Sequence, residues 1–325
     1  HKGGQCCMYD AERCTMHSQD KQHQTKLNLR DQGKVKELQW NAFESEDATG
    51  NRTKFKEGDA VVVANSAPCG ECDYCRRGRE NLCTDLQYIN GSFAEFIRVP
   101  ARFVDRHTHA IPKGLDFGKA ALTEPLACVL HGMDACELDK YGPGTEVVLF
   151  GGGPIGLLFV GALARAGHKV ILADPNLPRL DVGKQLGAAQ CVQIERGGGQ
   201  ADKVKALTEG GQGAWVAVDA SGVPEVWVDA INSVRPGGLV NLFGGCAPGT
   251  SIPLDTHAVH YSELTVKGVY HHRPDTIRRA LEMLADPAFR ADLMLSAEMP
   301  IEQTEAALRA MIAKDALKVV IRGAG

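Results

Sequence analysis

The sequence lacks any run of apolar residues approaching about 18, the length that a membrane-spanning helix requires. It also lacks a basic excess, because 36 lysines and arginines against 40 aspartates and glutamates leave a net charge of −4. No basic segment followed by an apolar stretch stands at the start, so a secretory signal is not indicated. These absences predict a cytoplasmic protein with neither a nucleic-acid partner nor a membrane partner.

Aromatic residues are also scarce, at 6% of the chain, whereas glycine occurs 36 times. This balance favours binding sites that are lined by backbone. A hydrophobic content of 44% and a charged content of 23% are typical of a globular chain with an ample core. At about 150 residues per domain, the length of 325 residues predicts two domains, or one large domain with insertions.

The first fifty residues contain a single β-branched aliphatic residue, Val35. They show neither the two-residue alternation of a strand nor the apolar stripe of a helix. We therefore expect them to be the least ordered part of the chain, or the part least like known families. From Thr53 onward, strand and turn patterns begin.

Strands and helices alternate from Thr145 to Gly245, which predicts parallel strands joined by right-handed crossovers. The expected strands there are Glu146–Phe150, Lys169–Ala173, Trp215–Ala220 and Leu239–Phe243, with helices over Pro154–Ala166 and after Pro224, and a turn at Arg235–Gly238. Before this region we expect strands at Ala60–Ala64 and Phe93–Val99 and a buried helix at Ala120–Met133. After it we expect strands at Leu264–Val269 and Lys318–Ile321 and helices at Pro274–Ala285 and Ile301–Ile312.

A glycine fingerprint follows the first of these strands and opens a helix. Gly151, Gly153 and Gly156 form G-x-G-x-x-G, with Pro154 and Ile155 between the last two glycines. This pattern predicts that the pyrophosphate of a dinucleotide binds at the helix N-terminus. The other interpretation is a glycine turn without a ligand.

Asp174 ends the next strand, where a carboxylate accepts hydrogen bonds from both ribose hydroxyls and repels a 2′-phosphate. The sequence therefore predicts NAD rather than NADP. Arg179 either lies near the adenine or is a solvated charge on a helix.

Four of the eleven cysteines lie close together. Cys69, Cys72, Cys75 and Cys83 form C-x2-C-x2-C-x7-C, a spacing that brings four thiolates to one point. Four thiolates leave no open coordination position, so we predict one structural zinc per chain. An iron–sulfur cluster and a disulfide pair are the alternatives.

The cysteine lobe, Ala94-Glu95-Phe96, Glu124-Pro125-Leu126 and the fingerprint together resemble the zinc-dependent medium-chain dehydrogenases, in the branch of the sorbitol (polyol) and threonine dehydrogenases. The resemblance runs from about Lys54 to the end. It implies an α/β fold in which a doubly wound Rossmann sheet is joined to a β-rich GroES-like catalytic domain of N- and C-terminal segments. The implied limits are 1–124 and 267–325 for the catalytic domain and 125–266 for the NAD-binding domain.

The resemblance also implies a role for Glu124, because the glutamate of this segment lies beside the catalytic zinc in the polyol branch. The simpler interpretation is a carboxylate favoured by the dipole of a helix N-terminus. The family takes its other zinc ligands from a cysteine loop and from a G-H-E histidine. Cys14 falls near the cysteine position without its motif, and no histidine stands at 39–41.

His17 and His23 are weak candidates for a replacement ligand. Four explanations stay open: a lost or altered N-terminus, a frameshifted segment, a rearranged zinc site, or loss of catalysis. We expect no complete catalytic zinc site, an empty or water-filled cleft beside Glu124, and low turnover.

The resemblance implies an oxidoreductase that transfers hydride between NAD and a secondary alcohol, with zinc assistance. The alcohol would be a polyol, a sugar or a threonine-like molecule, and the chain would form a homodimer or homotetramer. Two alternatives are a zinc-independent reductase of the same superfamily and a catalytically silent, NAD-binding zinc protein.

Overall fold

The computed structural model describes residues 55–56 and 58–323. The predictions for the first fifty residues, including those for Cys14, His17 and His23, lie outside this part of the chain.

A six-stranded sheet is the largest sheet of the described residues, and all its neighbouring strands run parallel. The strand order is β10-β9-β8-β5-β6-β7. Counted from β5, this is the order 3-2-1-4-5-6 of a doubly wound dinucleotide-binding fold, which confirms the predicted fold class. The strands are β5 (Glu146–Phe150), β6 (Lys169–Asp174), β7 (Gln190–Gln193), β8 (Ala214–Asp219), β9 (Val234–Leu242) and β10 (Thr265–Gly268).

Short helices connect the strands of this sheet. They are α6 (Pro154–Arg165), α7 (Leu177–Gln185), α8 (Ala201–Lys205), α9 (Pro224–Asn232) and α10 (Thr256–Tyr261), with a 3₁₀ turn η3 (Glu209–Gly211) before β8. Proline stands at the start of α6, where its missing N–H costs no helical hydrogen bond.

The central strand β5 shows why the sheet is covered on both faces. Val147 and Leu149 belong to one apolar core, and Val148 and Phe150 belong to the other. All four side chains are fully buried. Strands that are apolar on both faces are stable only between two layers of helices. Helices α6 and α7 pack into the first core, and α8 and α9 pack into the second.

The part of the chain before the sheet is built of short strands and helices. They are β1 (Val61–Val63), β2 (Ser66–Ala67), α2 (Asp73–Arg76), η1 (Glu80–Leu82), β3 (Gln87–Tyr88), α3 (Ala101–His107), β4 (Thr108–Ala110), α4 (Phe117–Ala120), α5 (Thr123–Ala135) and η2 (Leu138–Lys140). Strand β1 pairs antiparallel with β4, and β2 pairs antiparallel with β3.

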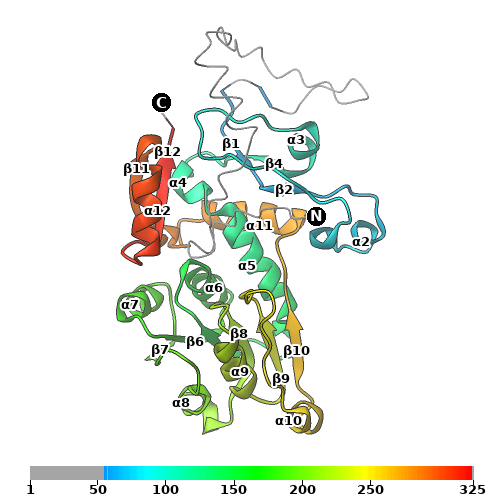
Figure 1. The fold of residues 1–325 in the computed structure, drawn as a ribbon, viewed down its shortest axis with the longest axis vertical. Helices are drawn as coiled ribbons and strands as arrows, with labels where there is room; N and C mark the ends of the chain where they lie inside the picture. The colour runs from blue at the N-terminus through cyan, green and yellow to red at the C-terminus, as the bar shows by residue number, and fades with distance from the viewer. Residues whose placement is uncertain (1–54, 57, 324–325) are drawn as a thin grey trace.

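The C-terminal segment returns from the sheet to this first part. It contains α11 (Pro274–Ala285), η4 (Ala291–Met294), β11 (Leu295–Pro300), η5 (Ile301–Gln303), α12 (Thr304–Ile312) and β12 (Lys318–Arg322), with β11 and β12 paired in parallel. Helices α5 and α11 pack against each other between the sheet and the first part of the chain (Figure 1). The first core continues through both helices to Ala64 and Leu122.

Three local predictions differ from the structure. The segment Phe93–Val99 is not a strand, because no strand of the described residues pairs with it, and Phe96 is 68% exposed. The helix expected from Ala120 begins at Thr123, after a break that follows α4. The turn expected at Arg235–Gly238 lies within β9, where the pairing with β8 shifts register between Ala214 and Val216.

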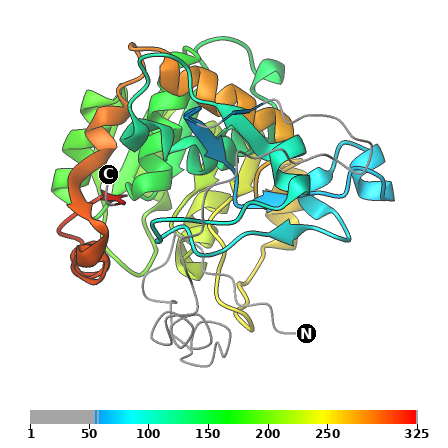
Figure 2. The same cartoon turned by 90° about the horizontal axis from the view of Figure 1, so that it is seen from above.

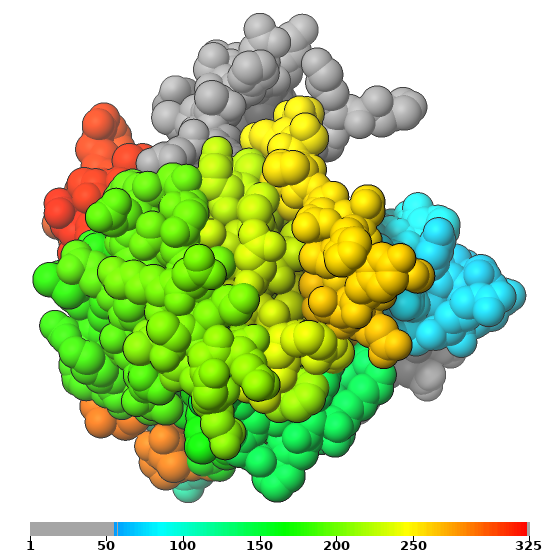
Figure 3. Space-filling view, turned by 90° about the horizontal axis from the view of Figure 1, so that it is seen from below, coloured from blue at the N-terminus to red at the C-terminus, as the bar shows by residue number. Residues whose placement is uncertain are grey.

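The predicted domain limits remain predictions, and the two internal limits fall within α5 and β10. The lobe around α2 projects from one side of the molecule, and β11 and α12 lie on the opposite side (Figure 2). The face seen in Figure 3 is formed largely by the sheet segment, with the α2 lobe at its edge. Among the described residues, no helix combines the length and the apolar character that crossing a membrane requires.

Candidate nucleotide and metal sites

The glycine turn between β5 and α6 has the geometry of a phosphate site. A Cβ atom on Gly156 would lie 1.7 Å from the carbonyl oxygen of Gly151, so the turn itself requires glycine there. Gly153 differs, because its φ of −69° suits any residue and a Cβ would meet no described atom within 4 Å. The space beside Gly153 lies at the N-terminus of α6, where free N–H groups attract phosphate.

Asp174 holds this turn at the end of β6. Its carboxylate accepts hydrogen bonds from the N–H of Gly152 at 2.6 Å and from the N–H of Asn176 at 2.7 Å, and its side chain is buried. Arg179, which is half-buried on α7, lies next to the turn, since its Cβ is 3.2 Å from the Cβ position of Gly152. The structure thus brings Asp174 and Arg179 to the fingerprint.

The loop after β8 forms the opposite wall, where the chain order of the sheet reverses. Asp219 is fully buried and accepts hydrogen bonds from the N–H groups of Ser221 and Gly222 at 3.1 Å and from Trp227 Nε1 at 3.0 Å. Burial raises the pKa of this carboxyl, and the hydrogen bonds oppose the rise. Ligands of doubly wound sheets bind at such a reversal point.

The four predicted thiols lie together in the lobe of residues 69–83. Cys69 Sγ lies 3.4 Å from Cys83 Sγ and 3.9 Å from Cys75 Sγ, and Cys72 Sγ lies 3.5 Å from Cys75 Sγ and 3.8 Å from Cys83 Sγ. Tetrahedral zinc with bonds of about 2.3 Å to sulfur would space its four ligands about 3.8 Å apart. The donor set therefore fits one closed zinc site.

Backbone N–H groups around these sulfurs favour thiolates. Glu71 and Cys72 donate to Cys69 Sγ at 3.4 and 3.3 Å, and Cys69 donates to Cys83 Sγ at 3.2 Å. The backbone N–H of Cys75 is the main cause that lowers the pKa of Cys72 to about 6. Burial, together with hydrogen bonding to the other thiols, raises the pKa of Cys75 to about 12. A cation bound at the centre would allow all four thiols to ionise together.

Glu124 lies in a second group of ligand-type side chains. One ligand atom each from Glu124, Cys128 and His271 lies within 4.8 Å of the other two. Cys128 Sγ is 3.5 Å from Glu124 Oε1, and Asn65 Nδ2 donates to the same oxygen at 3.2 Å. Glu124 also stands in the first turn of α5, so the helix dipole favours its charge, as the simpler interpretation expects.

His271 stands in the loop between β10 and α11, and its backbone φ of 62° is uncommon for a residue with a side chain. Ser66 Oγ lies 2.6 Å from its Nε2 atom. Burial, with the nearby His131, lowers the pKa of His271 to about 4, so its ring is neutral at pH 7. Its neighbour His272 is buried, and the same effect lowers the pKa of His272 well below its usual value.

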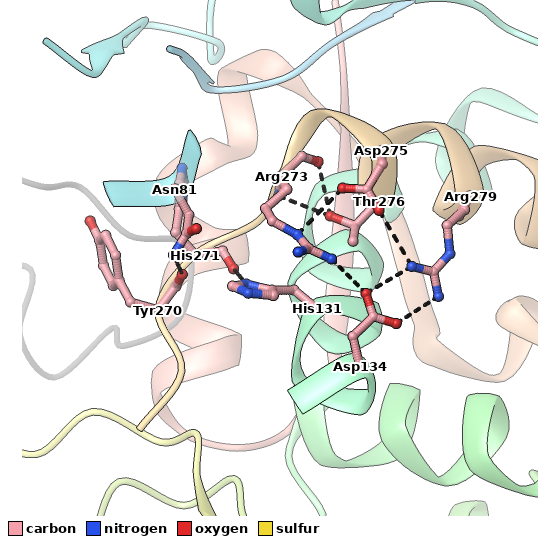
Figure 4. A network of polar contacts seen from close by, with 9 residues as sticks. All are labelled: Asn81, His131, Asp134, Tyr270, His271, Arg273, Asp275, Thr276 and Arg279. Carbon is pink, nitrogen blue, oxygen red and sulfur yellow. Dashed lines mark hydrogen bonds and ion pairs between the residues drawn. The ribbon is translucent and has the colours of Figure 1, made fainter. Parts of the chain in front are cut away.

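Figure 4 shows how this loop is held between three elements. Asn81 Nδ2, from η1 in the cysteine lobe, donates to the carbonyl oxygen of Tyr270 at 3.0 Å. His131 Nδ1, on α5, lies 2.7 Å from the carbonyl oxygen of His271. Asp134, one turn further along α5, accepts hydrogen bonds from Arg273 and, through both oxygens, from Arg279 of α11.

Sequence reasoning missed Cys128, His271 and His272. It left Glu124 as the one ligand-type residue of the described chain at this place, whereas the structure brings Cys128 and His271 beside it. A helical spacing of four between Glu124 and Cys128 was the available signal for the first of these. For His271 and His272 the available signal was their position shortly after a predicted strand of the parallel sheet.

Two known families match this chain. Residues 154–286 match the family described as zinc-binding dehydrogenase, and residues 33–112 match the alcohol dehydrogenase GroES-like domain. The second match begins at residue 33, whereas the motifs in the sequence predict a resemblance only from about Lys54 onward.

Known proteins resemble the chain over most of its length. Sorbitol dehydrogenase of Bacillus subtilis is 31% identical over 82% of this chain and 75% of its own length. D-altritol 5-dehydrogenase of Agrobacterium fabrum is 34% identical over 77% of this chain and 72% of its own. The structure of an alcohol dehydrogenase from Thermus sp. ATN1 superposes with a TM-score of 0.73 at 26% identity, covering 84% of this chain and 82% of that one.

Proposed function

Because this chain belongs to the zinc-binding dehydrogenases with an alcohol dehydrogenase GroES-like domain, we propose that it transfers hydride between a secondary alcohol and NAD. The alcohol is a polyol, a sugar or a threonine-like molecule. In the oxidative direction the alcohol loses a hydride to NAD and a proton to solvent, which leaves a ketone and NADH.

The main observation that supports a dinucleotide site at the glycine turn is the open space beside Gly153. Neither its backbone conformation nor its packing among the described residues requires glycine at this position. A ligand that approaches the backbone closely does require it, and the N-terminus of α6 supplies N–H groups to a pyrophosphate. Gly151, Gly153, Pro154, Ile155 and Gly156 are therefore assigned to the pyrophosphate.

Asp174 supports NAD over NADP. Its carboxylate already holds the turn through two backbone N–H groups, and its remaining lone pairs can accept from ribose hydroxyls. A 2′-phosphate would meet this negative charge. Arg179, half-buried at the turn, is assigned to the adenine side of the site.

Two zinc roles belong to the proposal. Cys69, Cys72, Cys75 and Cys83 hold a structural ion that fixes their lobe. Zinc beside Glu124, when bound, lowers the pKa of the substrate hydroxyl and so promotes loss of its proton. The chain itself supplies a polar wall there, in which His272 Nε2 lies 3.0 Å from Asn65 Oδ1 and Asn65 Nδ2 donates to Glu124.

The finer proposals concern substrate and assembly. A polyol is the substrate class that the names of the sorbitol and altritol relatives suggest. The family resemblance supports it, because Glu124 stands where simple alcohol dehydrogenases carry a cysteine. We also propose a cytoplasmic homodimer or homotetramer. Strand β10 supports assembly, because it is an edge strand of the six-stranded sheet and such edges offer hydrogen bonds to a second copy.

The test is the formation of NADH by the zinc-loaded full chain with a panel of polyols, sugars and threonine. Turnover with one of these classes supports the proposal. NADH binding without turnover on any of them would favour the silent NAD-binding protein, and turnover unchanged after complete zinc removal would favour the zinc-independent reductase. Light scattering during gel filtration distinguishes the dimer from the tetramer.

A further inference from the structure

We propose that Glu124, Cys128 and His271 form a zinc site whose ligands differ from those that the family uses beside the same glutamate. The proposal that an ion binds here is supported by the distances, the chemistry and the burial of the three side chains. Its use on the substrate hydroxyl rests on the proposed function.

The distances suit a small tetrahedral ion. Zinc bonds of about 2.3 Å to sulfur and about 2.1 Å to oxygen place these two ligands about 3.6 Å apart. Cys128 Sγ and Glu124 Oε1 are 3.5 Å apart. The three ligand atoms lie within 4.8 Å of one another, so a small rotation of the side chains brings all three to bonding distance of one ion.

The donor types point to zinc rather than to magnesium or calcium. Those two ions prefer oxygen ligands, whereas thiolate, imidazole and carboxylate together suit zinc. A thiolate and a carboxylate balance the two charges of the ion. Three protein ligands leave a fourth position for water or a substrate hydroxyl, as catalytic zinc requires.

The ligands stand on elements that the fold fixes in place. Glu124 and Cys128 are separated by one turn of α5, so their side chains lie on the same face of the helix. Cys128 is 6% exposed and the Glu124 side chain is 11% exposed, so both are shielded from bulk water.

His271 is aimed at them by a strained backbone. Its φ of 62° persists because Asn81 holds the carbonyl of Tyr270 and His131 holds the carbonyl of His271 (Figure 4). Such conformations cluster at functional sites. Ser66 Oγ, 2.6 Å from His271 Nε2, orients the ring, and Asn65 orients the Glu124 carboxylate. Outer partners of this kind are typical of metal ligands.

The experiment counts zinc ions per full chain by native mass spectrometry and measures the affinity of the weaker ion by chelator competition. The wild-type chain is expected to hold two zinc ions. Cys128→Ala and His271→Gln should each weaken the second ion more than about 100-fold, since a lost ligand costs more than a lost outer partner. Cys128→His keeps a donor and should recover most of the affinity.

Two controls assign the loss to this site. Cys191→Ala removes a half-buried thiol on β7 and should keep both ions. Cys14→Ala should also keep both, because the proposed ligand set does not include it. Each variant must retain the four-cysteine ion, which shows that the cysteine lobe has folded, and must bind NADH, which shows that the sheet has folded.

The proposal is overturned if the second ion persists in both Cys128→Ala and His271→Gln, or if Cys14→Ala removes it. It is also overturned if the wild-type chain holds a single ion. In each case the proposed function is tested separately from the metal site. NADH formation by the same wild-type preparation measures turnover, and titration with NAD measures binding at the glycine turn.

Discussion

Gly153 and Gly156 occupy the same turn for different physical reasons. The carbonyl of Gly151 leaves no room for a Cβ on Gly156, so the fold alone requires this glycine. The protein leaves the position beside Gly153 open. The fingerprint therefore combines a folding requirement with a ligand requirement, and substitution separates the two.

We predict that Gly153→Val weakens NAD binding at least tenfold, about 1.4 kcal/mol, and leaves the melting temperature within about 2 °C of wild type. The side chain would occupy the space assigned to the pyrophosphate. Quenching of protein fluorescence by NADH and a thermal scan measure the two effects. Gly156→Ala is the contrast and should unfold or melt early. Equal NAD affinity in Gly153→Val would remove the main support for the cofactor site.

At Asp174 we predict that Asp174→Ala combined with Pro175→Arg shifts preference from NAD toward NADP. The change removes the charge that repels a 2′-phosphate and adds one that attracts it. Titration of both cofactors gives the ratio of dissociation constants, and Pro175→Arg alone is the control. An unchanged ratio would show that the ribose lies elsewhere. Some loss of stability is expected too, because two backbone N–H groups lose their acceptor.

His107 predicts a pH dependence of stability. Burial lowers its pKa to about 4, and neither ring nitrogen has a hydrogen-bond partner among the described residues. Between pH 6.5 and pH 4 the His107 ring is protonated in the unfolded chain but stays neutral in the folded chain. The contribution of His107 to the free energy of unfolding is therefore fully present above pH 6.5. It is lost as the pH falls toward 4, by up to about 1.4 kcal/mol per pH unit. His107→Phe should flatten this part of the profile in thermal scans. His257→Phe, an exposed histidine on α10, should leave the profile unchanged.

At the scale of elements, the sequence predicts those strands, helices and sites that a regular local pattern of residues specifies. The continuous apolar run of β5 predicts a strand that is buried on both faces of a parallel sheet. The glycine turn after it predicts the end at which a dinucleotide binds. The four-cysteine spacing gives the closed metal site. These features are local, since each lies within about 20 residues.

The second metal group is not local, because Glu124 and Cys128 come from α5 and His271 comes from the loop after β10. No spacing in the sequence relates these segments, and the packing of α5 against α11 brings them together. The expected strand at Phe93–Val99 failed for a related reason. An apolar pattern predicts a strand only where another strand is available to pair with it.

The ion pairs of Asp134 on α5 with Arg273 and with Arg279 on α11, here called the clasp, support a further prediction. Asp134 accepts from Arg273 at 2.8 Å and from both terminal nitrogens of Arg279 at 2.8 and 2.9 Å. Asp134→Ala should lower the free energy of unfolding by about 1 kcal/mol, and less in high salt, because the pairs are partly exposed. Denaturant titration measures it. Asp73→Ala breaks an exposed pair with Arg77 and should have no measurable effect; an equal loss in both variants would refute the clasp.

At the scale of the whole molecule, two sources of stability are separate. The first apolar core runs without a break from Ala64 through α5 and α6 to Met294. The cysteine lobe has no such core, because Cys75, Asn81 and Cys83 are its only buried residues between 69 and 83. Metal bonds therefore take the place of apolar packing in the lobe, as in small metal-dependent domains.

We predict that Cys72→Ser loses one zinc ion and unfolds the lobe locally, while NAD affinity changes less than about twofold. The glycine turn belongs to the core of the sheet, which the lobe does not support. Hydrogen exchange should show lost protection at residues 69–83 and, through the Asn81 hydrogen bond, at Tyr270–Arg273, with β5 and β6 unchanged. Cys191→Ser should reproduce none of this. Full metal content in a folded Cys72→Ser chain would disprove the four-thiolate site, and loss of NAD binding would show that the two parts of the molecule unfold as one.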